Sequence, residues 1–132
     1  MNAKQFLTLG GIVLLLVGIL GFVGVIGPTP AQSIFGKTWY FDNTENVIHT
    51  VLGVAALALV LLKLKALYEP VTLLVGLAAL FFGILNFFLG SSMPNIGNAN
   101  LESPADLILH LGVGVWALSA WWMSRDAPAV VE

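Results

Sequence analysis

Residues 6–26 read FLTLGGIVLLLVGILGFVGVI, and this stretch decides the class of the fold. It contains no charged side chain, and its one polar side chain is that of Thr8. A helix rises about 1.5 Å per residue, so about 20 apolar residues cross the hydrocarbon core of a bilayer. The run is longer than the apolar region of a signal peptide, and we therefore expect it to be retained as a first membrane span.

The composition of the whole chain also indicates that lipid is its solvent. Of its 132 residues, 58% are hydrophobic and 9% are charged, whereas about 25% of the residues of a soluble domain are charged. The hydrophobic residues form long blocks instead of following the spacing of amphipathic helices or strands. We therefore predict an all-α integral membrane protein.

Three further apolar blocks complete the predicted bundle. They cover residues 46–64, 71–89 and 105–123, so that residues 1–132 form a single membrane domain. The connection between the second and third blocks is short, which predicts that these two helices are antiparallel neighbours. The fold class that follows is a four-transmembrane-helix bundle.

The positions of the basic residues predict the orientation of the bundle. Lys4, Lys63, Lys65 and Arg125 fall on one side of the four spans, and Lys37 falls on the other. By the positive-inside rule, both termini are cytoplasmic and the two longer loops face outward. We expect a multi-pass protein of a bacterial inner membrane or another membrane of the cytoplasmic type.

The chain contains an internal repeat. An acid, a histidine and a glycine recur at the same spacing in the second and fourth spans: Glu45, His49 and Gly53, then Asp106, His110 and Gly114. Residues 18–22 (GILGF) and 83–87 (GILNF) also correspond in the first and third spans. We therefore predict two copies of one helical hairpin, residues 1–65 and 66–132, as a parallel repeat about an axis along the membrane normal.

The acidic residues that precede the histidines are interpreted first as helix caps. Asp42 and Ser103 occupy predicted N-cap positions, and Glu45 and Asp106 occupy the N3 positions of the same helices. This is the capping-box pattern, and one such cap contributes about 1 kcal/mol. Glu45 and Asp106 also lie four residues before a histidine, so they are the first expected partners of the two imidazoles.

His49 and His110 are the candidate functional residues. An ionisable side chain inside a membrane span is costly and marks a functional hypothesis. The two histidines are predicted at equal depth, where each could hydrogen-bond a neighbouring helix, ligate a haem or a chlorophyll-type pigment, or take part in proton movement. A zinc site is less expected, because zinc would need three or four ligands and the chain has only two histidines.

The glycines and one amide are interpreted as packing residues. Small residues allow membrane helices to approach closely. The residues predicted to do so are Gly18, Gly21, Gly24, Gly53 and Gly114. Asn86 in the third span is predicted to hydrogen-bond between helices.

Several classes of function are disfavoured by what the sequence lacks. The chain has no cysteine, which excludes disulfides, thiolate metal sites and cysteine nucleophiles. Its formal net charge is -2 and it has no basic cluster, so nucleic-acid binding is not expected. The separate basic residues suit the anchoring of helix ends better than recognition of lipid headgroups.

Two segments carry a resemblance to known proteins. Residues 43–49 (NTENVIH) and 106–110 (DLILH) give the second and fourth spans a polar start followed by histidine. In this respect the chain resembles small bacterial four-helix membrane proteins of unknown function, although it has no asparagine beside the second histidine. The resemblance implies the fold and a bacterial inner membrane, and it implies no activity.

The function expected from these observations is binding without catalysis. The sequence shows no catalytic residues, no metal-ligand cluster and no glycine-rich phosphate loop. We expect an accessory subunit, embedded in the lipid bilayer, that packs against other membrane protein subunits or against itself. The alternatives are a haem- or chlorophyll-type pigment-binding protein that uses His49 and His110, and a conduit for a small molecule or ion.

Overall fold

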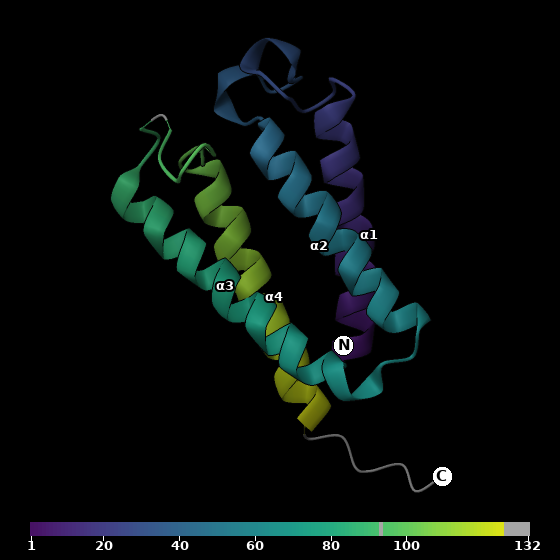
Figure 1. The fold of residues 1–132 in the computed structure, drawn as a ribbon. Coiled ribbons are helices and arrows are strands. Elements are labelled where there is room, and N and C mark those ends of the chain that lie inside the picture. Colours follow the sequence, from purple (N-terminus) through teal and green to yellow (C-terminus); the bar gives the residue numbers. More distant parts are fainter. Residues whose placement is uncertain (93, 126–132) are drawn as a thin grey trace, which may run out of the picture.

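The computed structural model describes residues 1–92 and 94–125 of the chain. These residues form four helices and no strand: α1 (Ala3–Phe22), α2 (Asn43–Leu61), α3 (Tyr68–Leu89) and α4 (Ala105–Arg125) (Figure 1). Each helix is long and apolar enough to cross a membrane. The predicted all-α bundle of four membrane helices is therefore confirmed. The last part of the predicted second repeat, residues 126–132, lies outside the described residues.

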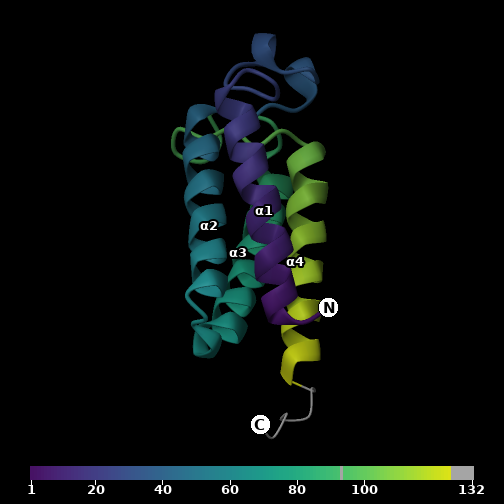
Figure 2. The same ribbon diagram turned by 90° about the vertical axis from the view of Figure 1, so that its right-hand side faces the viewer.

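The helices are arranged as two antiparallel hairpins. α1 packs along α2, and α3 packs along α4. The hairpins meet through α1, which contacts both α3 and α4, whereas α2 has few contacts with the second hairpin. Figure 2 shows α1 between α2 and α4, with α3 behind it.

The two hairpins diverge along the molecule. They lie close at the end that holds the N-terminus, the α2–α3 connection and the end of α4, and they separate toward the two longer loops (Figure 1). We call the first the terminal end and the second the loop end.

The observed helix ends differ from the ends of the apolar blocks, because capping residues determine where a helix begins and ends. α1 begins at Ala3 because Asn2 and Gln5 form a capping box. It ends at Phe22, four residues before the predicted boundary, because Gly24 has a φ of +82° and the N–H of Val25 closes the turn on the Leu20 carbonyl at 3.0 Å. Gly24 therefore terminates the helix instead of packing within it. α2 begins and ends three residues earlier than predicted, α3 begins three residues earlier, and α4 ends two residues later.

The first hairpin packs helix backbone against helix backbone. A Cβ atom added to Gly53 would lie 2.6 Å from the backbone nitrogen of Leu15, and one added to Gly18 would lie 2.9 Å from the backbone nitrogen of Thr50. Gly21 faces the side chain of Asn46 just as closely. Gly18 and Gly21 of α1, like Gly11, therefore face α2 and not the outside of the bundle, and they allow the two helices to approach closely.

The second hairpin uses its glycines differently. A Cβ atom added to Gly83 would lie 2.8 Å from Leu111 Cδ2, and one added to Gly114 would lie 2.6 Å from Leu80 Cδ2. Gly83 and Gly114, and likewise Gly76, thus each receive a leucine side chain from the facing helix. Both hairpins have glycines at equivalent positions, but the atoms that face them differ: helix backbone faces Gly53, and a leucine side chain faces Gly114.

The core that joins the hairpins lies toward the terminal end. It contains buried residues of all four helices, most of them alanine or aromatic: Ala3, Phe6, Leu7, Ala56, Tyr68, Ala117 and Ala120. Phe6 meets the indole of Trp116 edge to face at 4.8 Å between ring centroids. The backbone N–H of Ala3 also donates to Ser124 Oγ at 2.6 Å. Because alanines line α4 here, α1 can approach that helix closely.

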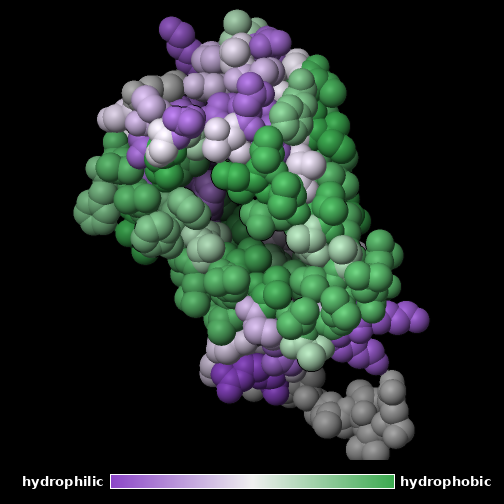
Figure 3. All heavy atoms as spheres, in the orientation of Figure 1, coloured by the Kyte–Doolittle hydropathy of each residue, from purple (hydrophilic) through white to green (hydrophobic). Residues whose placement is uncertain are grey.

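The remaining apolar side chains point away from the core. Space-filling coloured by hydropathy shows a broad apolar surface between polar ends (Figure 3). Between 17% and 28% of the residues of each candidate span are buried inside the chain. This distribution is typical of a multi-pass membrane protein, because the outward side chains require lipid or another apolar partner.

Candidate functional site

Three hydrogen bonds join the hairpins at the loop end. The Trp39 indole Nε1–H donates to Asp106 Oδ1 at 2.9 Å, and the Tyr40 backbone N–H donates to Glu102 Oε2 at 3.3 Å. In the opposite direction, the Asn100 backbone N–H donates to Asp42 Oδ2 at 2.8 Å. We call these three bonds the clasp. Each one pairs a donor of one hairpin with a carboxylate of the other.

The clasp carboxylates also hold the starts of α2 and α4. Asp42 and Glu45 form a capping box, in which the Glu45 N–H donates to Asp42 Oδ1 at 2.9 Å and the Asp42 N–H donates to Glu45 Oε2 at 3.0 Å. At α4, the Glu102 N–H donates to Asp106 Oδ2 at 2.6 Å. Ser103 instead exchanges hydrogen bonds between its main chain and the Ser91 hydroxyl. The residue that faces Asp106 at this cap is thus Glu102 and not Ser103.

Two buried amides connect the helices to the loops. Asn46 Nδ2 donates to the Phe41 carbonyl at 3.2 Å. Asn86 Nδ2 donates to the carbonyls of Gly90, at 3.2 Å, and Leu101, at 3.1 Å. Both asparagines are fully buried. The amide predicted to bond between helices therefore bonds the loop that leads into the neighbouring helix.

Burial raises the pKa of two loop residues at the clasp. Glu102 is 3% exposed, and its burial raises the pKa of its carboxyl to about 7. The nearby Asp106 carboxylate acts in the same direction. Burial, and then the negative charge of Glu102, raise the pKa of the Tyr40 hydroxyl as well. Glu102 can therefore change its charge near neutral pH.

The amide of Asn100 fits a protonated Glu102. Asn100 Nδ2 contacts Glu102 Oε1, while Asn100 Oδ1 is buried with no hydrogen-bond partner among the described residues. The two ends of a side-chain amide are distinguished only by their hydrogen bonds. With the amide turned over, a protonated Oε1 donates to Oδ1, and the buried oxygen gains a partner.

Both histidines hydrogen-bond their own helix. His49 Nδ1 lies 2.7 Å from the Glu45 carbonyl oxygen, and His110 Nδ1 lies 2.8 Å from the Asp106 carbonyl oxygen. The partner is the residue four positions earlier, as the spacing indicates, but it acts through its backbone and not its carboxylate. A carbonyl only accepts, so Nδ1 carries the proton and Nε2 of the neutral ring keeps a free lone pair.

The surroundings of the two imidazoles are similar. Both are half-buried, and each lies beside a phenylalanine ring. The His49 ring stacks on Phe41 with centroids 4.8 Å apart, and the His110 ring lies 6.1 Å from Phe82. The repeat thus places one imidazole near the start of α2 and an equivalent one near the start of α4, both toward the loop end.

The surface between the hairpins is hollowed below the clasp. Figure 3 shows a recess there, with apolar walls and polar atoms at its base. It forms because α2 stands clear of the second hairpin. Among the described residues, no group of three or more histidine or acidic side chains is arranged to hold a metal ion. The residues that could serve a cofactor are therefore His49 and His110, through their Nε2 atoms.

Sequence reasoning missed four members of the clasp. They lie in loops, and their partners are in the other hairpin, so no local pattern marks them: Trp39, Tyr40, Asn100 and Glu102. The available signal was the polar character of residues 95–103 just before an acid-led helix. That pattern indicates a polar contact, but it does not identify the partner residues in the first hairpin.

Comparison with protein-family models, with curated proteins and with solved structures finds no match to this chain. The resemblance to small bacterial four-helix membrane proteins therefore stays a prediction. Function is inferred below from the geometry of the chain itself.

Proposed function

We propose that this protein is an accessory subunit that packs against a larger membrane protein assembly and has no catalytic activity of its own. The observation that carries the proposal is the outward face of α3, where Phe81 is 60% exposed and Phe88 is 77% exposed. The equivalent positions of the repeat are Leu16 in α1 and Val23, the C-cap residue of α1. Lipid requires only apolar side chains, whereas protein interfaces are enriched in aromatic ones. The aromatic face of α3 therefore supports a protein partner.

The polar network supports binding over catalysis. Asp42, Glu45, Glu102 and Asp106 all accept hydrogen bonds from backbone N–H groups of this chain. Carboxylates engaged in this way hold loops and helix ends in place. They are poorly suited to act as a general base, which needs access to a substrate proton.

Site-specific photocrosslinking tests the proposed partner face. A photoreactive phenylalanine analogue at position 81 or 88 is expected to give one crosslinked product of discrete mass in membranes of the native host. The same analogue at positions 16 and 23 of α1 is the matched control and should react only with lipid. Equal protein crosslinking from both helices, or none from α3, would contradict the proposal.

The same proposal includes a membrane of the cytoplasmic type with both termini inside. The support is the distribution of lysines. Lys4 in α1 and Lys63 and Lys65 in the α2–α3 connection belong to the terminal end, and Lys37 in the α1–α2 loop belongs to the loop end. The chain has no cysteine, so single cysteines can be introduced without background. Thr38→Cys should react with an impermeant maleimide in intact cells, and Lys65→Cys should react only after permeabilisation. The reverse pattern would contradict the orientation.

A second candidate function is binding of a haem or chlorophyll-type pigment, and the histidine geometry favours it. Protein ligands of metals typically donate their other ring N–H to a carbonyl or carboxylate, which fixes the ring. His49 and His110 both do so, and each has an aromatic neighbour. Their Nε2 atoms would be the axial ligands, and the hydrogen bonds to the Glu45 and Asp106 carbonyls would orient them.

An absorption spectrum tests this second candidate. Gently purified protein is expected to absorb in the Soret region, and His49→Ala and His110→Ala should each remove or shift that band. Val51→Ala, at an exposed position on the same helix as His49, is the control and should leave the band unchanged. A colourless wild-type protein that is fully stable would exclude this function.

A further inference from the structure

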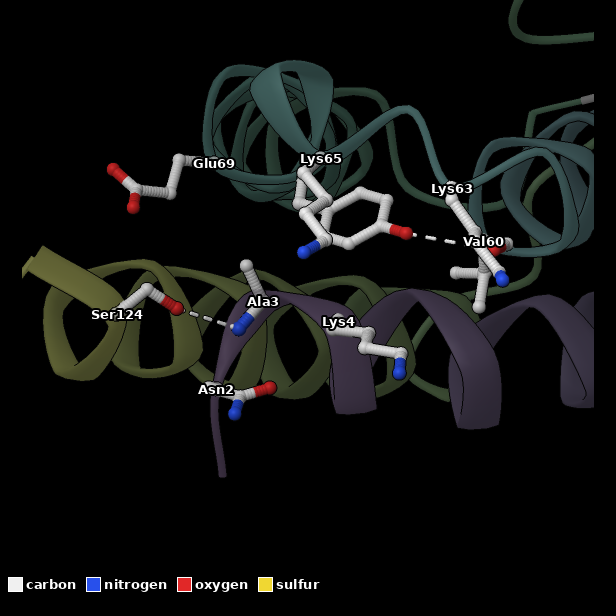
Figure 4. A pocket seen from close by; sticks show the side chains of 9 residues that line it. Asn2, Ala3, Lys4, Val60, Lys63, Lys65, Glu69 and Ser124 are labelled. Carbon is white, nitrogen blue, oxygen red and sulfur yellow. Dashed lines mark hydrogen bonds between the residues drawn. The ribbon is translucent and has the colours of Figure 1, made fainter. Parts of the chain in front are cut away.

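A cavity of about 560 Å³ opens at the terminal end of the molecule. It lies between the start of α1, the α2–α3 connection, the start of α3 and the end of α4 (Figure 4). Its lining includes Lys4 of α1, Lys63 and Lys65 of the α2–α3 connection, and Ser124 of α4. The fold thus gathers at one opening the lysines that the sequence suggested were separate helix-end anchors.

The amino groups of these lysines are available to a ligand. All three residues are exposed, and among the described residues none of their side chains has a hydrogen-bond or ion-pair partner. The acidic residue of the lining is Glu69, whose carboxylate is turned away from Lys65 in Figure 4. The first turns of α1 and α3 also border the cavity, and helix N-termini carry partial positive charge. The cavity is therefore suited to an anion.

The backbone at Lys63 is an independent sign that its side chain is used. α2 ends in a Schellman motif, in which the Leu64 N–H donates to the Leu59 carbonyl at 3.0 Å and the Lys63 N–H donates to the Val60 carbonyl at 3.1 Å. Lys63 has a φ of +56° in this motif, a conformation in which glycine is usual and a side chain is strained. The position would be more stable without a side chain, yet it presents an ammonium group to the cavity.

The place of the cavity in the membrane indicates what the anion is. It lies where the apolar spans end, which is the level of lipid headgroups. Basic pockets between membrane helices at this level suit the headgroups of acidic lipids. We propose that this cavity binds a phosphate group, and that the phosphate is carried by an anionic phospholipid of the adjacent leaflet. The proposal does not depend on the accessory-subunit function or on the histidines.

Native mass spectrometry of the full chain in a neutral detergent tests the proposal. The probes are phosphatidylglycerol, phosphatidylcholine with the same acyl chains, and inorganic phosphate. The wild-type protein is expected to retain phosphatidylglycerol at least ten-fold more tightly than phosphatidylcholine, and inorganic phosphate should compete only at far higher concentration. Equal affinity for the two lipids overturns the site. Full competition by equimolar inorganic phosphate overturns a lipid as its source.

Variants separate the cavity from general electrostatic attraction. Lys63→Gly is expected to raise the melting temperature, because it relieves the strained φ, and to weaken phosphatidylglycerol binding. Combined with Lys65→Ala, it should weaken binding by roughly five-fold for each lysine removed. Lys37→Ala changes the net charge as much as Lys63→Gly alone but lies at the loop end, so it should leave the affinity unchanged. An equal loss with Lys37→Ala, or unchanged binding by Lys63→Gly/Lys65→Ala, contradicts the proposal.

Discussion

The two hairpins share a glycine framework but differ in what faces the glycines. In the first, Gly53 meets the backbone of α1, and in the second the equivalent Gly114 meets a leucine side chain of α3. Gly18 and Gly83 differ less sharply. Gly18 meets the Thr50 hydroxyl together with the Thr50 backbone nitrogen at 2.9 Å, whereas Gly83 meets the Leu111 side chain at 2.8 Å and its backbone nitrogen at 3.2 Å. A backbone cannot move away from an added methyl group, whereas the end of a leucine side chain can turn. The first hairpin should therefore be the less tolerant half of the molecule.

The strongest test of this difference is a matched pair of glycine substitutions. Gly53→Ala should lower the free energy of unfolding by about 3 kcal/mol, because its Cβ would lie 2.6 Å from the Leu15 nitrogen. Gly114→Ala should cost less, about 1 kcal/mol, because the Leu80 side chain can change rotamer and the Leu80 backbone nitrogen is 3.1 Å from the added Cβ. Reversible unfolding in mixed micelles measures both. Equal costs would show that the hairpins pack alike.

A second test uses the pH dependence of the clasp, where the second hairpin contributes Glu102. Burial raises the folded-state pKa of Glu102 from 4.5 to about 7, so between these values the folded protein holds a proton that the unfolded chain releases. The free energy of unfolding should therefore fall as pH rises from 4.5 to 7, by on the order of 3 kcal/mol, and then level off.

The control for this pH dependence is Glu102→Gln. An amide does not titrate, so the free energy of unfolding of the variant should depend less on pH between 4.5 and 7 than that of the wild type. Unfolding curves of the wild type and the variant, measured at several pH values in the same detergent, give the difference. Parallel curves would mean that Glu102 does not hold a proton in the folded protein.

A third test compares the two buried amides. Asn86→Ala removes hydrogen bonds to two loop carbonyls and should cost about 2 kcal/mol, whereas Asn46→Ala removes one and should cost about 1 kcal/mol. The measurement is again the free energy of unfolding in mixed micelles. A larger loss for Asn46→Ala would place more of the stability in its contact with Gly21 than in the loop hydrogen bond.

The smallest expected effect is a gain in stability. Gly112 lies within α4, and a Cβ atom added there meets nothing within 4 Å. Gly112→Ala should therefore stabilise the protein by about 0.5 to 1 kcal/mol through helix propensity alone. Loss of stability in this variant would indicate a packing partner at that face of α4.

The sequence predicts much of the architecture because the membrane imposes it. Helices are required where backbone groups cannot reach water, and the length of an apolar block then gives the number of spans. The repeat of Glu45, His49 and Gly53 in α4 correctly indicates two similar hairpins. Helix ends were less accurate, because residues such as Gly24 end a helix within apolar sequence.

The contacts between the hairpins could not be predicted in the same way. The partner of Trp39 lies 67 residues away, and the lysines of the terminal cavity come from separate segments. Hydropathy and spacing carry no information on such pairs. The histidine spacing identified the right residues, Glu45 and Asp106, but it could not distinguish their carbonyls from their carboxylates.

The measurement that tests the central proposal most directly is the mass of the protein extracted with its surrounding lipid from the native membrane. An accessory subunit is expected in a particle that contains a stoichiometric partner, well above the 14.0 kDa of the chain. Phe81→Leu combined with Phe88→Val gives α3 the side chains that α1 has at Leu16 and Val23, and should release the chain from that particle. A single chain extracted without a partner, or a double variant that stays bound, would contradict the account.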